Sequence, residues 1–324
     1  MNYVNLGKTG VKVSQLCFGT MSFGAEADEE MSGRMFQRCR EAGINFFDCA
    51  DAYGKGTAET ILGRLLDDCR DEIVLTTKVH GPMSKDVNAG GLSRRHIVSA
   101  VEASLKRLKT DRIDIYFAHK FDAHTDMEQI LYAFEDLVRA GKVIYTAVSN
   151  WAAYQIATAL GISRKERIAE FQCIQPMYNL AKRQAEVELL PLAQAENMAV
   201  TPYSPLGGGL LTGKYGVGQK PDAGRLVDVG FYSKRYSLEQ YYQTADRFVA
   251  HARERGVSPA TLGVAWVMSH PAITAPIIGA RNLDQLEASL AATGLDMTPE
   301  WRKEITDLSA APPPATDRLE ETLD

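Results

Sequence analysis

The chain has 324 residues, of which 45% are hydrophobic and 24% are charged, and its formal net charge is −5. These proportions are typical of a globular protein with a substantial core, and an acidic balance without a basic block argues against a nucleic-acid-binding surface or attraction to acidic lipid. The sequence has neither an apolar run near the ~20 residues of a membrane span nor a signal-peptide core, so we expect a cytoplasmic protein that binds neither membrane nor nucleic acid.

Residues 1–14 are predicted to form a β-hairpin with a glycine-containing turn at Lys8–Gly10. After it, eight short apolar runs, rich in β-branched and aromatic residues, read as buried parallel strands. These runs are Gln15–Thr20, Asn45–Ala50, Ile73–Val79, Ile113–His119, Val143–Asn150, Phe171–Tyr178, Met198–Pro205 and Ile273–Ala280. Between them, apolar residues recur at helical spacing, for example from Ile97 to Leu108, with Ser93 placed to cap that helix, and from Met127 to Val138.

Eight strand-then-helix units, most about thirty residues long, predict an α/β fold of the (β/α)8 TIM barrel type. A doubly wound Rossmann sheet is the main alternative, but Gly19–Gly24 after the first strand does not match G-x-G-x-x-G. We therefore expect one barrel domain spanning residues 1–324, with the hairpin at 1–14 and an exposed tail at 310–324. The five cysteines have no metal-type or C-x-x-C spacing, which favours buried free thiols and no metal.

The regular alternation is interrupted between Pro205 and Ile273, where we expect an extra loop and two helices. The loop Gly216–Ser237 is rich in glycine and basic residues and carries three aromatic residues, Phe231, Tyr232 and Tyr236. A loop of this length in a compact barrel is usually functional, often as a lid. A disordered insertion is the alternative.

Four ionisable residues lie where strands meet their loops. Asp48, Lys78 and His119 lie at or next to the carboxyl ends of the second, third and fourth strand runs, and Tyr53 follows in the loop after the second. Each could have an ordinary structural role by itself, but barrel enzymes place their reactive groups at the carboxyl ends of the strands. Together, the four residues predict an active site.

The chemistry of this site follows from its charges. A free tyrosine has a pKa of about 10, and we expect the Lys78 ammonium to lower the pKa of Tyr53. Asp48 would keep Lys78 charged, while His119 would orient a substrate carbonyl, whose oxygen Tyr53 protonates. The sequence offers no nucleophile elbow or metal-binding pair, so a hydride from a bound cofactor is the natural reductant. A Schiff-base aldolase acting through Lys78 stays open on chemistry alone.

Ordered motifs run along the chain: Leu16–Met21, Phe47–Gly54, Thr77-Lys78, Asp114–Tyr116 with His119, Ser149-Asn150, Gln175–Asn179, Tyr203–Leu206 with Gly208–Tyr215, and Ile278–Arg281. In this order they resemble the aldo-keto reductase family, from the hairpin to about residue 295. The resemblance implies NADPH-dependent reduction of a small-molecule carbonyl substrate by a monomer or homo-oligomer. Its catalytic tetrad falls on Asp48, Tyr53, Lys78 and His119. A non-catalytic nicotinamide-nucleotide-sensing subunit is the other alternative.

The resemblance also implies a binding site for NADPH/NADP+. Its nicotinamide contacts fall on Ser149, Asn150, Gln175 and Tyr203, and the first two strand ends contribute Gly19, Thr20, Met21 and Asp48. The pyrophosphate contacts fall on Ser204, Pro205, Leu206, Gly208 and Lys214, with Arg225 of the loop nearby. The adenosine end falls on Gly279, Arg281, Gln285 and Ser289, and we expect Arg281 to select NADPH over NADH.

Two positions depart from the family pattern. Lys120-Phe121 stands where members often have Trp-Pro after the catalytic histidine, and Ala288-Ser289 stands where they often have Glu-Asn. The first departure changes the wall of the substrate pocket, so the sequence does not identify the substrate.

Overall fold

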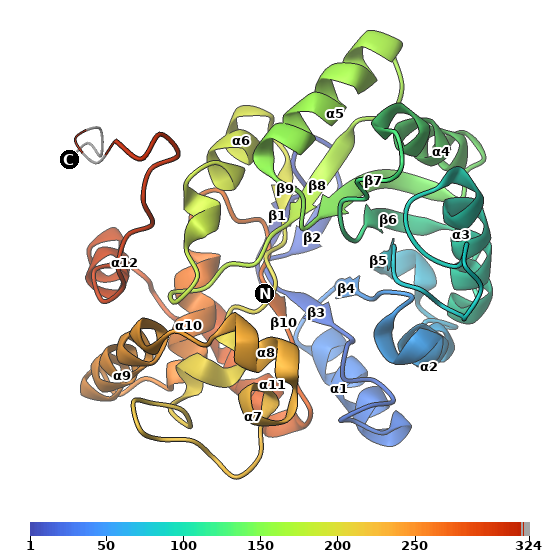
Figure 1. Ribbon diagram of the computed structural model, residues 1–324. Helices are drawn as coiled ribbons and strands as arrows, with labels where there is room; N and C mark the ends of the chain where they lie inside the picture. Colours follow the sequence, from blue (N-terminus) through green and yellow to red (C-terminus); the bar gives the residue numbers. More distant parts are fainter. Residues whose placement is uncertain (319, 321–324) are drawn as a thin grey trace.

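The eight predicted strand runs form eight parallel strands that curve into a barrel with helices around it, as Figure 1 shows. The computed structural model describes residues 1–318 and 320. The strands, in chain order, are β3 (Cys17–Gly19), β4 (Phe46–Asp48), β5 (Val74–Val79), β6 (Ile113–Ala118), β7 (Val143–Ser149), β8 (Phe171–Gln175), β9 (Ala199–Val200) and β10 (Ile277–Ile278). From β3 to β9 each strand pairs in parallel with its neighbour in the chain, and β10 pairs in parallel with β3. The predicted (β/α)8 fold is confirmed.

The last two strands are shorter than predicted. Each run contains a proline, Pro202 or Pro276, that has no backbone N–H to give to a strand ladder. Three backbone hydrogen bonds still join these segments: the N–H groups of Thr274 and Ala275 donate to the Val200 carbonyl at 2.9 Å and 3.3 Å, and that of Ile277 donates to the Pro202 carbonyl at 2.9 Å. These bonds connect the two ends of the sheet and close the barrel.

The helices follow the predicted alternation, and Ser93 caps α3 by accepting a hydrogen bond from the His96 N–H at 3.3 Å. Those before the interruption are α1 (Glu29–Glu41), α2 (Thr57–Leu65), α3 (Arg94–Leu108), α4 (Met127–Arg139), α5 (Ala153–Glu166) and α6 (Leu189–Ala195). Those after it are α7 (Arg225–Asp228), α8 (Gly230–Arg235), α9 (Glu239–Glu254), α10 (Pro259–Met268), α11 (Leu283–Leu290) and α12 (Pro299–Thr306). Short 3-10 turns fall at η1 (Tyr53–Gly56), η2 (Arg70–Glu72), η3 (Gln184–Glu186), η4 (Gly207–Thr212) and η5 (Ala291–Gly294).

The predicted hairpin, β1 (Tyr3–Asn5) and β2 (Lys12–Ser14), is antiparallel and belongs to the core of the barrel. Its Leu6 and Val13 are fully buried and pack in one cluster with strand residues that include Phe46 and Phe117. A larger cluster fills the space between the strands and the helices. The hairpin therefore closes the end of the barrel opposite to the strand carboxyl ends.

Residues 216–237, which we call the lid segment, fold into α7 and α8 with the turns around them. Leu226, Tyr232 and Tyr236 in this segment are buried, so it is not a disordered insertion.

Four of the five cysteines are buried, as predicted, and all five are free. No helix in the described part of the chain combines the length and the hydropathy needed to cross a bilayer. The described part of the predicted tail is mostly exposed, while residues 319 and 321–324 lie outside the described residues.

Candidate active site

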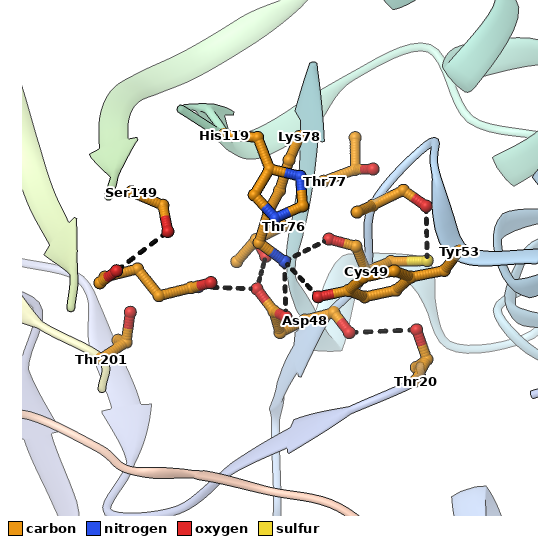
Figure 2. A network of polar contacts seen from close by, with 12 residues as sticks. Thr20, Asp48, Cys49, Tyr53, Thr76, Thr77, Lys78, His119, Ser149 and Thr201 are labelled. Carbon is orange, nitrogen blue, oxygen red and sulfur yellow. Dashed lines mark hydrogen bonds and ion pairs between the residues drawn. The ribbon is translucent and has the colours of Figure 1, made fainter. Parts of the chain in front are cut away.

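The four predicted catalytic residues meet at the carboxyl ends of β4, β5 and β6, as Figure 2 shows. Asp48 is the last residue of β4, Tyr53 begins the η1 turn that follows, and His119 comes directly after β6. Parallel pairing sets Asp48 opposite Thr76 and Lys78 opposite Phe117, which brings three neighbouring strand ends to one mouth.

The Lys78 side chain is fully buried and its ammonium lies at the centre of the group. Its Nζ atom lies 2.6 Å from Asp48 Oδ2, 2.6 Å from the Cys49 carbonyl oxygen and 3.3 Å from the Tyr53 hydroxyl. Burial acts to lower the pKa of Lys78, but the Asp48 carboxylate and the Tyr53 hydroxyl together outweigh it, and the pKa is raised. A lysine held protonated in this way is a poor nucleophile, which disfavours the Schiff-base alternative.

Asp48 is held from two further sides. Its Oδ1 atom accepts hydrogen bonds from Thr76 Oγ1 at 2.7 Å and from Gln175 Nε2 at 2.9 Å. The role of Thr76 was missed in the sequence, although it stands two residues before Lys78 and so faces the same side of β5. These bonds fix the carboxylate that in turn fixes the Lys78 ammonium.

The pKa of Tyr53 is raised overall, although Lys78 acts to lower it as expected. Burial raises the pKa of Tyr53 to about 12, and the lowering effect of Lys78 is smaller than this. The tyrosine ring is half-buried, yet its hydroxyl lies inside the polar group beside Lys78. Tyr53 is therefore fully protonated at neutral pH, and the ammonium favours the phenolate once the proton has left.

His119 lies opposite Tyr53 across the mouth, with 6.2 Å between the ring centroids and 80° between the ring planes. Burial lowers the pKa of His119 to about 3, and the positive charges of Lys78 and Lys120 add to this effect. A neutral imidazole can donate a hydrogen bond to a carbonyl oxygen without adding a charge.

The four predicted nicotinamide-binding residues form a connected set beside this group. The Ser149 hydroxyl donates to the Gln175 carbonyl at 2.9 Å, and the Asn150 amide donates to Ser149 Oγ and to the His119 carbonyl, both at 2.9 Å. The Tyr203 hydroxyl donates to Asn150 Oδ1 at 2.7 Å. Through these bonds the set is linked to Asp48 and His119.

Predicted phosphate contacts gather around η4. Gly207, Gly208 and Gly209 all have positive φ angles, of 61°, 69° and 99°. A Cβ atom at Gly208 would lie 3.1 Å from side-chain atoms of Leu226 and Tyr232 in the lid segment. The glycine is therefore needed both for the backbone conformation and for the close approach of the lid. Ser204, Pro205 and Leu206 lead directly into this turn.

Three cations collect at the same place. Burial lowers the pKa of Lys214, and the positive charges of Arg281 and Arg225 lower it further, so both guanidinium groups act electrostatically on the lysine. Arg225 also forms an ion pair with Glu26 at 3.2 Å, which connects the lid segment to the loop after β3. Clustered cations next to a glycine-rich turn suit a phosphate group, so these residues fit the phosphates of a dinucleotide.

The predicted adenosine end lies where β10 meets α11. Asn282 caps α11, the Arg281 N–H donates to Gln285 Oε1 at 3.2 Å, and the Ser289 hydroxyl donates to the Gln285 carbonyl at 3.3 Å. The carboxyl end of β3 brings Gly19, Thr20 and Met21 beside it, because β3 pairs with β10. A Cβ atom on Gly279 would lie 4.0 Å from the Gly19 carbonyl oxygen, and Thr20 Oγ1 donates to the Asp48 carbonyl at 3.0 Å.

A buried polar cluster behind the site was not predicted. Glu59 accepts hydrogen bonds from Thr77 Oγ1 and Arg107 Nε, both at 2.6 Å. Asp51 is fully buried, and within the described residues neither of its carboxylate oxygens has a hydrogen-bond partner. Burial, together with the charge of Glu59, raises the pKa of Asp51 to about 7. No local motif signals this cluster, because its members come from the loop after β4 and from α2, α3 and β5.

Beside Asn150 and Tyr203 lies a pocket of about 220 Å³, lined mostly by apolar side chains that include Trp151, Ile156 and Met177. A second pocket, of about 400 Å³, lies at the other end of the barrel near Lys8, Tyr145 and Glu170, far from the tetrad. Among the described residues, no group of three or more His, Cys, Asp or Glu side chains is arranged to hold a metal ion.

Comparison with known proteins gives a consistent result. The model of the "Aldo/keto reductase family" matches residues 15–310. The chain is 38% identical to "Uncharacterized oxidoreductase YrpG" of Bacillus subtilis (strain 168), over 96% of this chain and 97% of that protein. It is 35% identical to a "Probable voltage-gated potassium channel subunit beta" of Oryza sativa subsp. japonica, over 95% of each chain. It is 36% identical to a protein of the same name from Arabidopsis thaliana, over 90% of this chain and 91% of that one.

Proposed function

The chain belongs to the aldo/keto reductase family, and on this premise we propose that it is an NADPH-dependent carbonyl reductase that converts an aldehyde or ketone reversibly to an alcohol. Tyr53 is its general acid in reduction and its general base in oxidation. The proposal also assigns the cofactor site to the glycine-rich turn at η4, the cation cluster around Lys214 and the residues beside Asn150.

When bound, the reduced nicotinamide supplies a hydride to the carbonyl carbon. Tyr53 gives its hydroxyl proton to the carbonyl oxygen, so the C=O group gains one hydride and one proton and becomes an alcohol. The Lys78 ammonium stabilises the phenolate that Tyr53 leaves behind, and Asp48 holds Lys78 in place. Neutral His119 donates a hydrogen bond that orients the carbonyl oxygen. Solvent then returns a proton to Tyr53.

The observation that carries the proposal is the Lys78 ammonium, which lies 2.6 Å from a carboxylate and 3.3 Å from the hydroxyl of a protonated tyrosine. This arrangement supports proton delivery to an oxygen atom at neutral pH. The test is a panel of aldehydes and ketones with NADPH and NADH, run in both directions. We expect turnover of several carbonyls with a preference for NADPH. The absence of turnover on every carbonyl would contradict the proposal.

A non-catalytic nicotinamide-nucleotide-sensing subunit is the second candidate, because two of the relatives carry the name of a potassium channel β subunit. The hydrogen-bonded tetrad favours the enzyme instead, since a sensing subunit has no need of a positioned acid. Tight NADPH binding, negligible turnover and recovery of a stable membrane-protein partner would together favour this second candidate.

A further inference from the structure

Arg235, the last residue of α8, is a half-buried cation surrounded by aromatic rings. Its guanidinium carbon lies 5.1 Å from the ring centroid of Tyr232, 5.5 Å from that of Phe231 and 5.9 Å from that of Tyr203. In the described part of the chain it forms no ion pair and no side-chain hydrogen bond, whereas Arg225 on the same lid pairs with Glu26. Aromatic rings offset only part of the loss of water around a guanidinium, so its hydrogen-bond donors are available to an anion.

The position of Arg235 connects it to the catalytic end of the site. Tyr203, one of its three aromatic neighbours, donates to Asn150, and Asn150 donates to the His119 carbonyl. Lys214, Arg225 and Arg281 form a separate cation cluster, which suits the phosphates of the cofactor. With the cofactor phosphates assigned to those three cations, the anion that Arg235 would bind is a group on the substrate.

The charges around the mouth agree with an acidic substrate. Lys120 is exposed directly after His119, and its positive charge helps to lower the pKa of His119. Asp48 is paired with Lys78, and Asp122 is fixed by hydrogen bonds from the N–H groups of Leu92 at 2.8 Å and His124 at 2.9 Å, so neither forms an ion pair with Lys120 or Arg235. Lys120 and Arg235 form no ion pair among the described residues, and their positive charges attract an anion to the mouth.

We propose that the substrate is a carbonyl compound bearing a carboxylate or phosphate group, and that Arg235 on the lid binds this group. The inference rests on the proposed reductase function and adds the substrate class. Because the guanidinium can form paired charge-assisted hydrogen bonds, it also selects acidic substrates over neutral ones of the same shape.

The test compares 4-formylbenzoate with its methyl ester, which have the same aldehyde but differ in charge. The wild-type protein should show the higher kcat/KM for the carboxylate. Arg235→Gln should lower kcat/KM for the carboxylate by about 10- to 100-fold, the range for loss of a hydrogen bond to a charged group, and change that for the ester by less than about threefold. Arg235→Lys should retain an intermediate preference. Lys234→Gln removes the same charge from the neighbouring, exposed position and should leave both values unchanged.

Binding of NADPH and NADH, followed by fluorescence, separates the two sources of an anion. A contrary result is that Arg235→Gln weakens the binding of NADPH and NADH alike and leaves the ratio of kcat/KM for the acid to kcat/KM for the ester unchanged. In that case Arg235 contacts the pyrophosphate, and the substrate assignment is wrong. An equal loss on both aldehydes would likewise overturn it, since the residue would then act on lid structure alone. A wild-type protein that reduces the ester as well as the acid also overturns it. The reductase function itself would be contradicted only if the wild-type protein turned over none of the carbonyls tested.

Discussion

Replacement of Tyr53 by phenylalanine tests the proposed general acid directly. The change removes one hydroxyl and keeps the ring, and Lys78 retains its two 2.6 Å contacts with Asp48 and the Cys49 carbonyl. The loss of one 3.3 Å hydrogen bond should cost only about 0.5–1.5 kcal/mol of folding stability. General acid catalysis contributes about 10²–10⁴-fold, or about 2.7–5.5 kcal/mol of activation free energy. We therefore expect kcat to fall by this factor while NADPH affinity hardly changes.

The assay is steady-state reduction of the best aldehyde from the panel, with the NADPH dissociation constant measured separately by fluorescence quenching. Tyr116→Phe is the matched control, because the Tyr116 hydroxyl is buried and has no partner among the described residues. That variant should keep wild-type kcat. If Tyr53→Phe retains more than about a tenth of wild-type kcat, another group delivers the proton and the mechanism is wrong.

Three further predictions test other parts of the structure. Arg281→Ala should raise KM for NADPH strongly and that for NADH very little, because the 2′-phosphate is what the guanidinium is expected to bind; a wild-type protein that uses NADH equally well would refute this role. The lid segment 216–237 is expected to close over the cofactor phosphates, with Lys220 and Arg225 near them, so limited proteolysis there should slow markedly with NADPH, and equal rates with and without it would remove the lid hypothesis. Asp51→Asn should stabilise the protein in urea unfolding, because the pKa of Asp51 rises from 3.8 to about 7 on folding. Between these two pH values the folded state keeps a proton on Asp51 that the unfolded state loses. The folding stability that the wild-type protein loses through Asp51 therefore grows from about pH 4 and levels off above about pH 7, at about 4 kcal/mol at most. A gain that does not increase between pH 4 and pH 7 would contradict this.

The features that could be predicted from the sequence depend on local patterns. Runs that are apolar on both faces predicted the strands, and helical spacing predicted α3 and α4. The proximity of Asp48 and Lys78 could be predicted because neighbouring parallel strands end at the same edge of the sheet. The same patterns overestimated β9 and β10, because an apolar run looks the same whether or not a proline within it, such as Pro202 or Pro276, lacks the N–H that the strand ladder needs.

What could not be predicted depends on packing between distant segments. The pKa of Tyr53 required a comparison of burial with the charge of Lys78, and the degree of burial is not encoded in any motif. The cluster of Asp51, Glu59 and Arg107 joins side chains that are up to 56 positions apart in the sequence. The approach of Arg235 to Tyr203 likewise depends on where the lid segment lies over the barrel.

The N-terminal hairpin has a consequence for the electrostatics of the tetrad. It lies outside the segment that matches the family model, yet its Leu6 and Val13 pack in the same cluster as Phe117, whose ring centroid is 5.9 Å from Lys78 Nζ. The apolar cluster to which the hairpin contributes therefore continues up to the ring beside the ammonium. A protein lacking residues 1–14 would admit water from below, raise the local dielectric constant and weaken the attraction between Lys78 and Asp48. The hairpin thus helps to keep a low dielectric constant beneath the tetrad, although it lies at the opposite end of the barrel.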